Sequence, residues 1–220
     1  MFNKTKTVII AALLSQLGFS TLLLANELQP SPVHFESVSY PTYFQVTGVA
    51  ADDMLHIRTE PNTSGEIVGD LASDAGPIEV LYSENGWAYL SSGENMGWAS
   101  KSFLTQIELP KIANSALPFG LTCGGTEPFW SINISDESIE LNQMNEGISN
   151  FSIMETGAYT GDTISFIIAG AEGKMITTII SNEIYGDGMS DKYYGRKINM
   201  LLSTPNGTKG YLGACSVEAN

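Results

Sequence analysis

Alternation of apolar and polar residues is the feature that most constrains the fold of this 220-residue chain. Between Phe129 and Ile134, the side chains of Ile132 and Ile134 would face one side of a strand, while those of Ser131 and Asn133 face the other. The pattern returns in several short segments that Gly, Asn and Asp residues separate. A period of two with turn residues between the segments is typical of antiparallel sheets that bury one face. No segment beyond the N-terminus keeps a helical period, so we predict an all-β protein.

Composition divides the chain into five segments. They are a signal peptide (1–25), a linker (26–42), a β domain (43–105), a second linker (106–118) and a second β domain (119–218). Prolines mark both linkers, in which few residues are expected to pack into a core. We therefore expect two independently folded β domains. The second should be a small antiparallel β-barrel or sandwich with strands at Phe129–Ile134, Ser138–Gln143, Ser149–Glu155, Thr163–Ile168, Lys174–Ile180, Lys197–Ser203 and Lys209–Ala214.

The N-terminus has the features of a secretory signal peptide. Lys4 and Lys6 precede an apolar run, Val8–Leu24, which polar residues interrupt and Ala25 follows. A membrane-spanning helix usually needs about 20 apolar residues in a row, whereas a small residue after a shorter run suits cleavage. We expect cleavage after Ala25, no stable membrane insertion afterwards and a periplasmic or secreted protein. Retention of the segment as an anchor is the alternative. The first cysteine is Cys123, so we expect no lipid on the mature N-terminus.

The charge balance is strongly acidic. Lys and Arg total 10 against 24 Asp and Glu, which gives a formal net charge of −14. Proteins bind the phosphates of nucleic acids and anionic lipid surfaces with basic side chains, so neither is an expected partner. A negative surface attracts cationic proteins instead, which makes a basic enzyme a candidate partner.

Four short motifs in the first β domain carry a family resemblance. Asp53–Pro61, with the sequence DMLHIRTEP, is followed by Glu66–Leu71, Gly86–Leu90 and Gly97–Ala99. In their order and spacing these motifs resemble the bacterial SH3 domain along its whole length. The resemblance implies a small SH3-like barrel that acts as a binding module, often for cell-wall peptide or glycan.

Aromatic and basic side chains are the binding candidates in this domain. They are Trp87, Tyr89, Trp98 and Arg58. The alternative is structural, because large aromatic residues in a small barrel mostly belong to the core. Arg58 would then form a surface ion pair or a hydrogen bond to a turn. Gly69, Gly86 and Gly97 are predicted to lie in tight turns that need a backbone without a Cβ.

The second β domain shares motifs with another family. Cys123–Ser131 has the sequence CGGTEPFWS, Tyr185–Asp191 has YGDGMSD, and Gly213–Cys215 has GAC. These motifs resemble those of a family of exported bacterial proteins and lipoproteins whose function is uncharacterised, although Tyr185 replaces a cysteine of the family pattern. The resemblance therefore names a domain and no activity.

Four side chains of these motifs are further candidates for binding. They are Glu127, Trp130, Asp187 and Asp191. Trp130 would alternatively plug one end of a barrel. Asp187 and Asp191 are expected to form a local Asx-turn rather than a calcium site, because one loop does not supply the oxygen ligands that Ca²⁺ needs. The sequence pairs Glu127 with no second carboxylate, and we expect no metal and no cofactor.

Two cysteines are present, Cys123 and Cys215, near the start and the end of the second domain. In an exported chain two cysteines normally form a disulfide, which is our prediction. A pair of reactive thiols is the alternative, but no histidine or Cys-x-x-Cys spacing in this domain would activate either sulfur.

No catalytic set is evident, so we expect a protein that is not an enzyme. The histidines are His34, in the first linker, and His56, which alternates outward on a strand of the first domain. Neither is expected to reach a cysteine or serine nucleophile in the second domain. The leading interpretation is a cell-envelope protein that binds the wall or an envelope protein. The alternative is a periplasmic inhibitor of a basic enzyme such as lysozyme, because Glu155–Tyr159 resembles a loop of such inhibitors. A cell-wall hydrolase or its accessory is the third interpretation.

Overall fold

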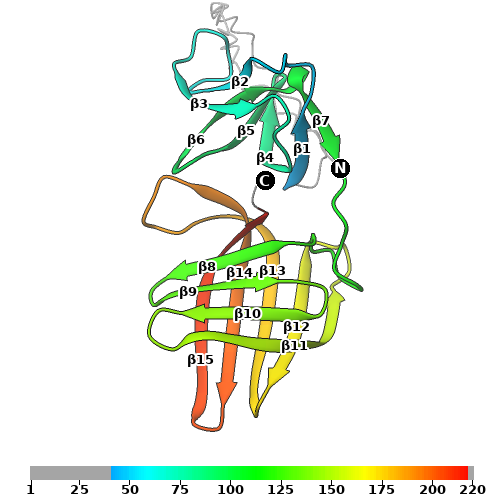
Figure 1. Cartoon of the computed structure of the whole chain (residues 1–220), viewed down its shortest axis with the longest axis vertical. Coiled ribbons are helices and arrows are strands. Elements are labelled where there is room, and N and C mark those ends of the chain that lie inside the picture. Colours follow the sequence, from blue (N-terminus) through cyan, green and yellow to red (C-terminus); the bar gives the residue numbers. More distant parts are fainter. Residues whose placement is uncertain (1–40, 218–220) are drawn as a thin grey trace, which may run out of the picture. The chain divides into compact units, whose positions relative to one another are not determined.

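The computed structural model describes residues 41–217, so the predicted signal peptide and nearly all of the first linker lie outside the described residues (Figure 1). Within this range every regular element is a strand except one 3₁₀ turn at Lys101–Phe103. No helix of the described range is long and apolar enough to cross a membrane. The all-β prediction is confirmed.

The first domain forms a seven-stranded antiparallel sheet. Its strands are β1 (Thr42–Val46), β2 (Met54–Arg58), β3 (Ile67–Ala72), β4 (Ile78–Glu84), β5 (Trp87–Ser92), β6 (Asn95–Ser100) and β7 (Leu104–Ile107). They are ordered β3-β2-β6-β5-β4-β1-β7 across the sheet. On β2, Leu55 and Ile57 are buried while His56 lies exposed between them, as the alternation predicts. One face therefore holds the core, to which β1, β4 and β5 add Phe44, Val80 and Leu90.

The three glycines expected in turns play different roles. Gly69 lies within β3, where it pairs with Ile57 of β2, so its prediction as a turn residue is wrong. Gly86 lies in the turn between β4 and β5 with a φ of 83°, which an L side chain rarely adopts. Gly97 lies instead within β6, and a Cβ there would meet Cγ2 of Ile57 at 2.5 Å. Its prediction as a turn residue is wrong, because the close packing of β6 on the core requires the glycine.

The second domain is a closed eight-stranded barrel, which decides between the barrel and the sandwich. Its strands are β8 (Leu121–Thr126), β9 (Phe129–Ile134), β10 (Ser138–Gln143), β11 (Gly147–Ala158), β12 (Ile164–Ala171), β13 (Lys174–Gly186), β14 (Tyr193–Thr204) and β15 (Gly207–Val217). Each strand pairs with its neighbours in the chain, and the barrel closes between β15 and β8. Figure 1 shows β8, β9 and β10 crossing in front of β13, β14 and β15. Strand β8 is the one strand of the barrel that the sequence analysis did not predict.

A disulfide lies at the closure of the barrel. Cys123 and Cys215 are directly opposite each other on β8 and β15, with an S–S distance of 2.03 Å. The predicted disulfide is confirmed, and it joins the first and last strands of the barrel. Both sulfurs belong to the buried cluster that fills the barrel, together with Ile132, Leu141 and Phe151. The barrel interior is a packed apolar core.

The connector between the two domains is packed rather than free. Ile112 is 1% exposed and Leu117 is 2% exposed, and both belong to the core cluster of the barrel. Lys111 and Pro118 form a β-bridge, which closes a short loop between these residues. This differs from the expectation that few residues of the linker would pack. Sheet and barrel belong to the same compact unit of the chain.

Candidate functional site

A row of four side chains crosses the outer face of the first sheet. Arg58 on β2 pairs with Trp98 on β6, Trp98 pairs with Tyr89 on β5, and Tyr89 pairs with Tyr82 on β4. Directly opposed residues in an antiparallel sheet point to the same face. Their neighbours Ile57, Ala88 and Ala99 point to the core on the other face. We call Tyr82, Tyr89 and Trp98 the aromatic row, with Arg58 at its end.

The three rings of the aromatic row touch one another. The ring centroids of Tyr82 and Tyr89 are 4.7 Å apart, those of Tyr89 and Trp98 are 5.0 Å apart, and those of Tyr82 and Trp98 are 5.3 Å apart. Trp98 is 8% exposed, whereas both tyrosines are partly exposed. Burial raises the pKa of the Tyr82 and Tyr89 hydroxyls, so both phenols stay protonated and can donate hydrogen bonds. The row thus offers two partly exposed rings on a packed indole, which is a surface for stacking with polar tips.

Tyr82 is the member of the row that the sequence did not suggest. Val80 pairs with Leu90 on the core face, and the register shifts between Val80 and Tyr82. Strict alternation from Val80 would turn Tyr82 to the core, whereas the bulge at Leu81 turns it to the outer face. The bulge therefore completes the aromatic row.

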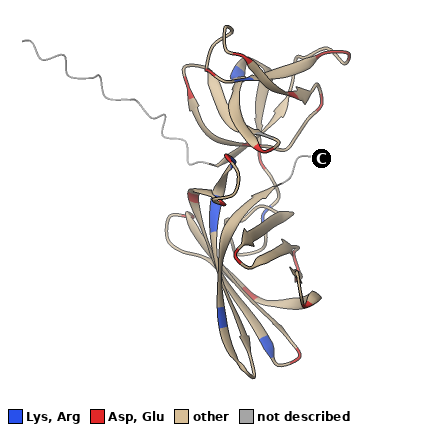
Figure 2. Cartoon of the chain, turned by 90° about the vertical axis from the view of Figure 1, so that its left-hand side faces the viewer, with Lys and Arg blue, Asp and Glu red and all other residues tan. Residues whose placement is uncertain are grey.

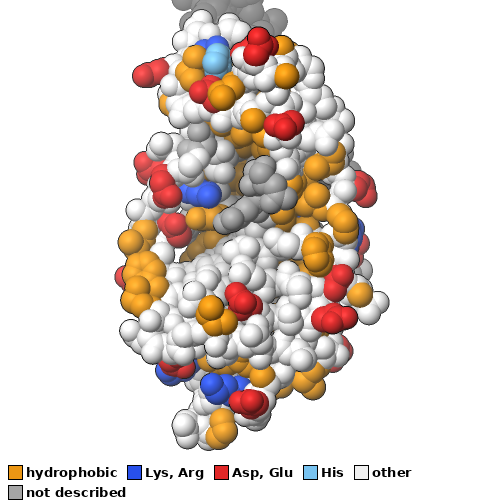
Figure 3. All heavy atoms as spheres, viewed as in Figure 1, with side chains coloured by type: hydrophobic (Ala, Val, Ile, Leu, Met, Phe, Trp, Pro, Cys, Tyr) orange, Lys and Arg blue, Asp and Glu red, His pale blue; other side chains and the backbone are white. Residues whose placement is uncertain are grey.

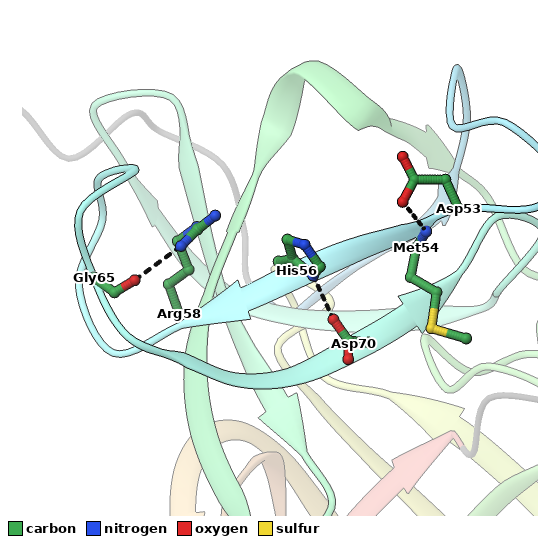
Figure 4. A network of polar contacts seen from close by, with 6 residues as sticks. All are labelled: Asp53, Met54, His56, Arg58, Gly65 and Asp70. Atoms are coloured by element: carbon green, nitrogen blue, oxygen red, sulfur yellow. Dashed lines mark hydrogen bonds and ion pairs between the residues drawn. The ribbon is translucent and has the colours of Figure 1, made fainter.

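Arg58 holds the loop that follows β2. Nη1 of Arg58 donates a hydrogen bond of 2.9 Å to the carbonyl oxygen of Gly65 (Figure 4). The side-chain oxygen of Asn62 accepts hydrogen bonds from the backbone N–H groups of Ser64 and Gly65. A Cβ at Gly65 would meet the backbone nitrogen of Glu60 at 2.9 Å. Of the two structural roles considered for Arg58, the structure shows the hydrogen bond to a turn.

Two other residues considered from the sequence lie on the same outer face. Trp87 is partly exposed and lies opposite Glu84 and Ser100, one step along β5 from the aromatic row. Nδ1 of His56 lies 2.5 Å from Oδ1 of Asp70, in an exposed pair that joins β2 to β3 (Figure 4). Trp87 extends the aromatic surface, while His56 is part of a strand-to-strand contact.

Trp130 occupies the interior of the barrel. It is 5% exposed, and its ring meets that of Tyr211 edge-on with centroids 5.7 Å apart. The hydroxyl of Tyr211 accepts a hydrogen bond of 2.9 Å from Nε2 of Gln143. A Cβ on Gly125 would lie 2.5 Å from Nε1 of Trp130, and a Cβ on Gly213 would lie 3.0 Å from Cζ2. The structure places Trp130 in the core, and the glycines of two motifs make room for its indole.

Asp187 organises the loop between β13 and β14. Its Oδ1 accepts hydrogen bonds from the backbone N–H groups of Met189 and Ser190, at 2.9 and 3.0 Å. Although desolvation acts to raise the pKa of Asp187, these hydrogen bonds hold it below its ordinary value. This is the geometry of an Asx-turn. Asp191 is exposed beyond the turn. Among residues 41–217 no group of three or more His, Cys, Asp and Glu is arranged to hold a metal ion.

The three barrel motifs meet at one place. Glu127, Asp187 and Gly213, one from each motif, line a cavity of about 430 Å³ beside the end of β8. The hydroxyl of Thr126 lies 3.5 Å from the backbone oxygen of Asp187. The motifs are thus neighbours in space although 86 residues separate Glu127 from Gly213 in the chain. Glu127 is exposed and has no second carboxylate in hydrogen-bond contact among the described residues.

Residues 53–105 match the bacterial SH3 domain family. The matched range contains all four sequence motifs of the first domain, and with them Arg58 and the whole aromatic row. The SH3 resemblance of this domain is confirmed. The match ends before β8, and it therefore concerns the sheet alone. No curated protein matches the chain.

Proposed function

We propose that this chain is an exported, non-catalytic protein of the cell envelope, which binds peptidoglycan through the aromatic row of its SH3 domain. The observation that carries the proposal is the row itself. Tyr82, Tyr89 and Trp98 come from three adjacent strands and present their rings on one outer face of a domain type associated with binding. Rings held in place by a sheet lose little conformational freedom when a ligand stacks on them.

The disulfide supports export. A bond between Cys123 and Cys215 forms and persists in oxidising compartments such as the periplasm or the cell exterior. The resemblance of the barrel motifs to a family of exported proteins agrees with the same location.

The charge of the chain favours stacking over ionic contact as the means of binding. Figure 2 marks few Lys and Arg positions along the ribbon, with Asp and Glu positions spread over both the sheet and the barrel, and Figure 3 shows few Lys and Arg side chains on the face in view. Peptidoglycan is itself largely anionic, so the long-range force between it and a chain of formal charge −14 is repulsive. Salt screens this repulsion. We therefore expect binding to strengthen with added salt.

A co-sedimentation assay with purified sacculi tests the proposal. The mature chain should appear in the pellet, and the double variant Tyr82→Ala/Tyr89→Ala should stay in the supernatant. Tyr159→Ala is the matched control, because Tyr159 is a 54% exposed tyrosine of the barrel. Wild-type protein that stays in the supernatant at every salt concentration contradicts the proposal. So does a double variant that sediments like the wild type.

An inhibitor of a basic enzyme is the second candidate. The observations that favour it are the acidic charge and the exposure of Tyr159, which ends the segment that resembles an inhibitor loop. Titration of the mature protein into a lysozyme assay separates this function from wall binding. Unchanged turnover at micromolar protein removes the inhibitor from consideration. Incubation with sacculi tests catalysis in the same preparation, because a hydrolase would release soluble muropeptides.

A further inference from the structure

A second cavity, whose lining includes no residue of the aromatic row, is lined by several polar groups. Its volume is about 390 Å³. The lining comes from β1, from the end of β7 with the packed connector, from the loop between β11 and β12, and from β13 and β14, all within one compact unit of the chain. The groups that matter here are Thr42, Tyr43, Lys111, Asn182 and Arg196.

Arg196 is a buried cation with an unused donor. The residue is 3% exposed, and its Nη1 donates a hydrogen bond to the hydroxyl oxygen of Tyr43. Nε of Arg196 has no hydrogen-bond partner among the described residues. The carboxylate of Glu79 lies 3.7 Å from Nη1, which is an ion-pair distance beyond ordinary hydrogen-bond length. A buried guanidinium is stable only where its charge and its donors are both compensated, so its surroundings favour an additional acceptor.

Two hydroxyl groups of β1 accompany Arg196 in the lining. Oγ1 of Thr42 is buried and has no hydrogen-bond partner among the described residues. The hydroxyl oxygen of Tyr43 accepts from Arg196, which leaves its proton available for an acceptor. Burial raises the pKa of the Tyr43 hydroxyl, so this proton is retained at neutral pH. Three residues that carry such donors, Thr42, Tyr43 and Arg196, thus line one cavity.

We propose that this cavity binds a small organic carboxylate, whose oxygens accept hydrogen bonds from Arg196, Tyr43 and Thr42. The apolar part of such a ligand would lie against Ile107, Leu109 and Pro118, which line the same cavity. Glu108 and Asp162 also line it and repel anions, while Lys111 attracts them. The carboxylate of Glu79, 3.7 Å from Nη1 of Arg196, adds to the repulsion when it is ionised. This balance favours a monoanion over inorganic phosphate, which is a mixture of monoanion and dianion at neutral pH.

Calorimetric titration with hexanoate, hexanamide and inorganic phosphate tests the proposal on the mature chain. Hexanoate and hexanamide have nearly the same shape and differ in charge. Hexanoate should bind with saturation, and hexanamide should bind about tenfold more weakly, since one charge-assisted hydrogen bond corresponds to at least that factor. Phosphate should bind more weakly than hexanoate.

Variants assign the site. Thr42→Val keeps the side-chain volume, removes one hydroxyl and should weaken the binding of hexanoate about fivefold. Lys111→Gln should weaken it less, and Lys174→Gln, an exposed lysine in the turn region of β12 and β13, is the charge-matched control that should leave affinity unchanged. Arg196→Gln should abolish saturable binding, and its unfolding transition is measured alongside. If Arg196→Gln does not fold, Thr42→Val decides.

Three results would overturn the proposal. They are equal affinity for hexanoate and hexanamide, unchanged hexanoate affinity in Thr42→Val, and no saturable binding of hexanoate to the wild type. Tighter binding of phosphate than of hexanoate would show that the cavity recognises anions other than carboxylates, and would likewise contradict the proposed class.

Discussion

Replacing Glu79 by glutamine should remove a loss of stability that the wild type undergoes as the pH rises from acidic to alkaline. Glu79 lies on β4 with a side chain that is 10% exposed, and Gly195 donates a backbone hydrogen bond to it. Desolvation raises the pKa of Glu79 from 4.5 to about 7, because the attraction of Arg196 only partly offsets the loss of water around the carboxylate. Between about pH 4.5 and pH 7, the folded chain therefore keeps a proton on Glu79 that the unfolded chain has mostly lost.

The size and sign of the effect follow from this difference in pKa. Below about pH 4.5 Glu79 is protonated in both states, and its burial then carries no ionisation cost. As the pH rises to about 7 the unfolded chain releases the proton first, so the free energy of unfolding falls. Because one pKa unit corresponds to about 1.4 kcal/mol, the total loss is about 3 kcal/mol. Glutamine has no proton to release, and the Glu79→Gln variant should lack this loss.

Urea unfolding at about pH 5 and about pH 8 measures the effect. The wild type should lose about 2.5 kcal/mol more than Glu79→Gln between the two conditions, because the unfolded chain has already released part of this proton at about pH 5. The control is Glu84→Gln, which removes an exposed glutamate from the same strand and so reports the change in net charge alone. If Glu79→Gln retains the pH dependence of the wild type, or if Glu84→Gln removes as much of it, then the reasoning from burial is wrong.

Three further predictions concern the stability of the two folds. Reduction of the Cys123–Cys215 disulfide should lower the free energy of unfolding by up to about 4.6 kcal/mol. Alkylation of the denatured chain should add two alkyl groups only after reduction, and alkylation of the unreduced chain would contradict the bond. Gly213→Ala should lower the free energy of unfolding by about 1–3 kcal/mol, because its Cβ would collide with the backbone of Gly124 and press on Trp130. Gly210→Ala, whose Cβ would lie 3.7 Å from its nearest neighbour, should lower it much less, and equal losses in denaturant unfolding would refute the packing argument. Arg58→Ala should leave the sheet folded and cost about 1 kcal/mol, the value of one hydrogen bond to Gly65, and a circular dichroism spectrum without the wild-type signal would show that the side chain does more.

Local pattern determined how well each strand of the barrel could be predicted. The predicted ranges of β9 and β10 coincide with the structure, since Ile132, Ile134, Ile139 and Leu141 alternate cleanly with polar residues. Strand β8 contains Gly124 and Gly125, which give no hydrophobic period. Its strand conformation comes from pairing with β9 and β15, a tertiary interaction that a local pattern does not contain.

The residues of the candidate sites could be predicted only where a local alternation of apolar and polar residues indicates which face a side chain occupies. Arg58, Tyr89 and Trp98 belong to motifs in which the alternation gives the correct face, whereas Tyr82 needs a β-bulge that no pattern announces. The contact between Arg196 and Tyr43 joins residues 153 positions apart. Nothing in either local sequence signals it, and it depends on the tertiary contact of β14 with the first sheet, in which β14 meets β4. Gly97 shows the converse error, since a glycine that suggests a turn can instead permit close packing inside a strand.

The most direct test of the central claim is an NMR titration of the mature, isotope-labelled chain with soluble peptidoglycan fragments. We expect the largest shifts at the backbone amides of Tyr82, Tyr89 and Trp98 and at the indole N–H of Trp98. The indole N–H of Trp130, which is buried in the barrel, should not move. An absence of shifts at saturating ligand would contradict peptidoglycan binding. Shifts confined to the barrel would show that the ligand binds elsewhere and that the aromatic row serves packing alone.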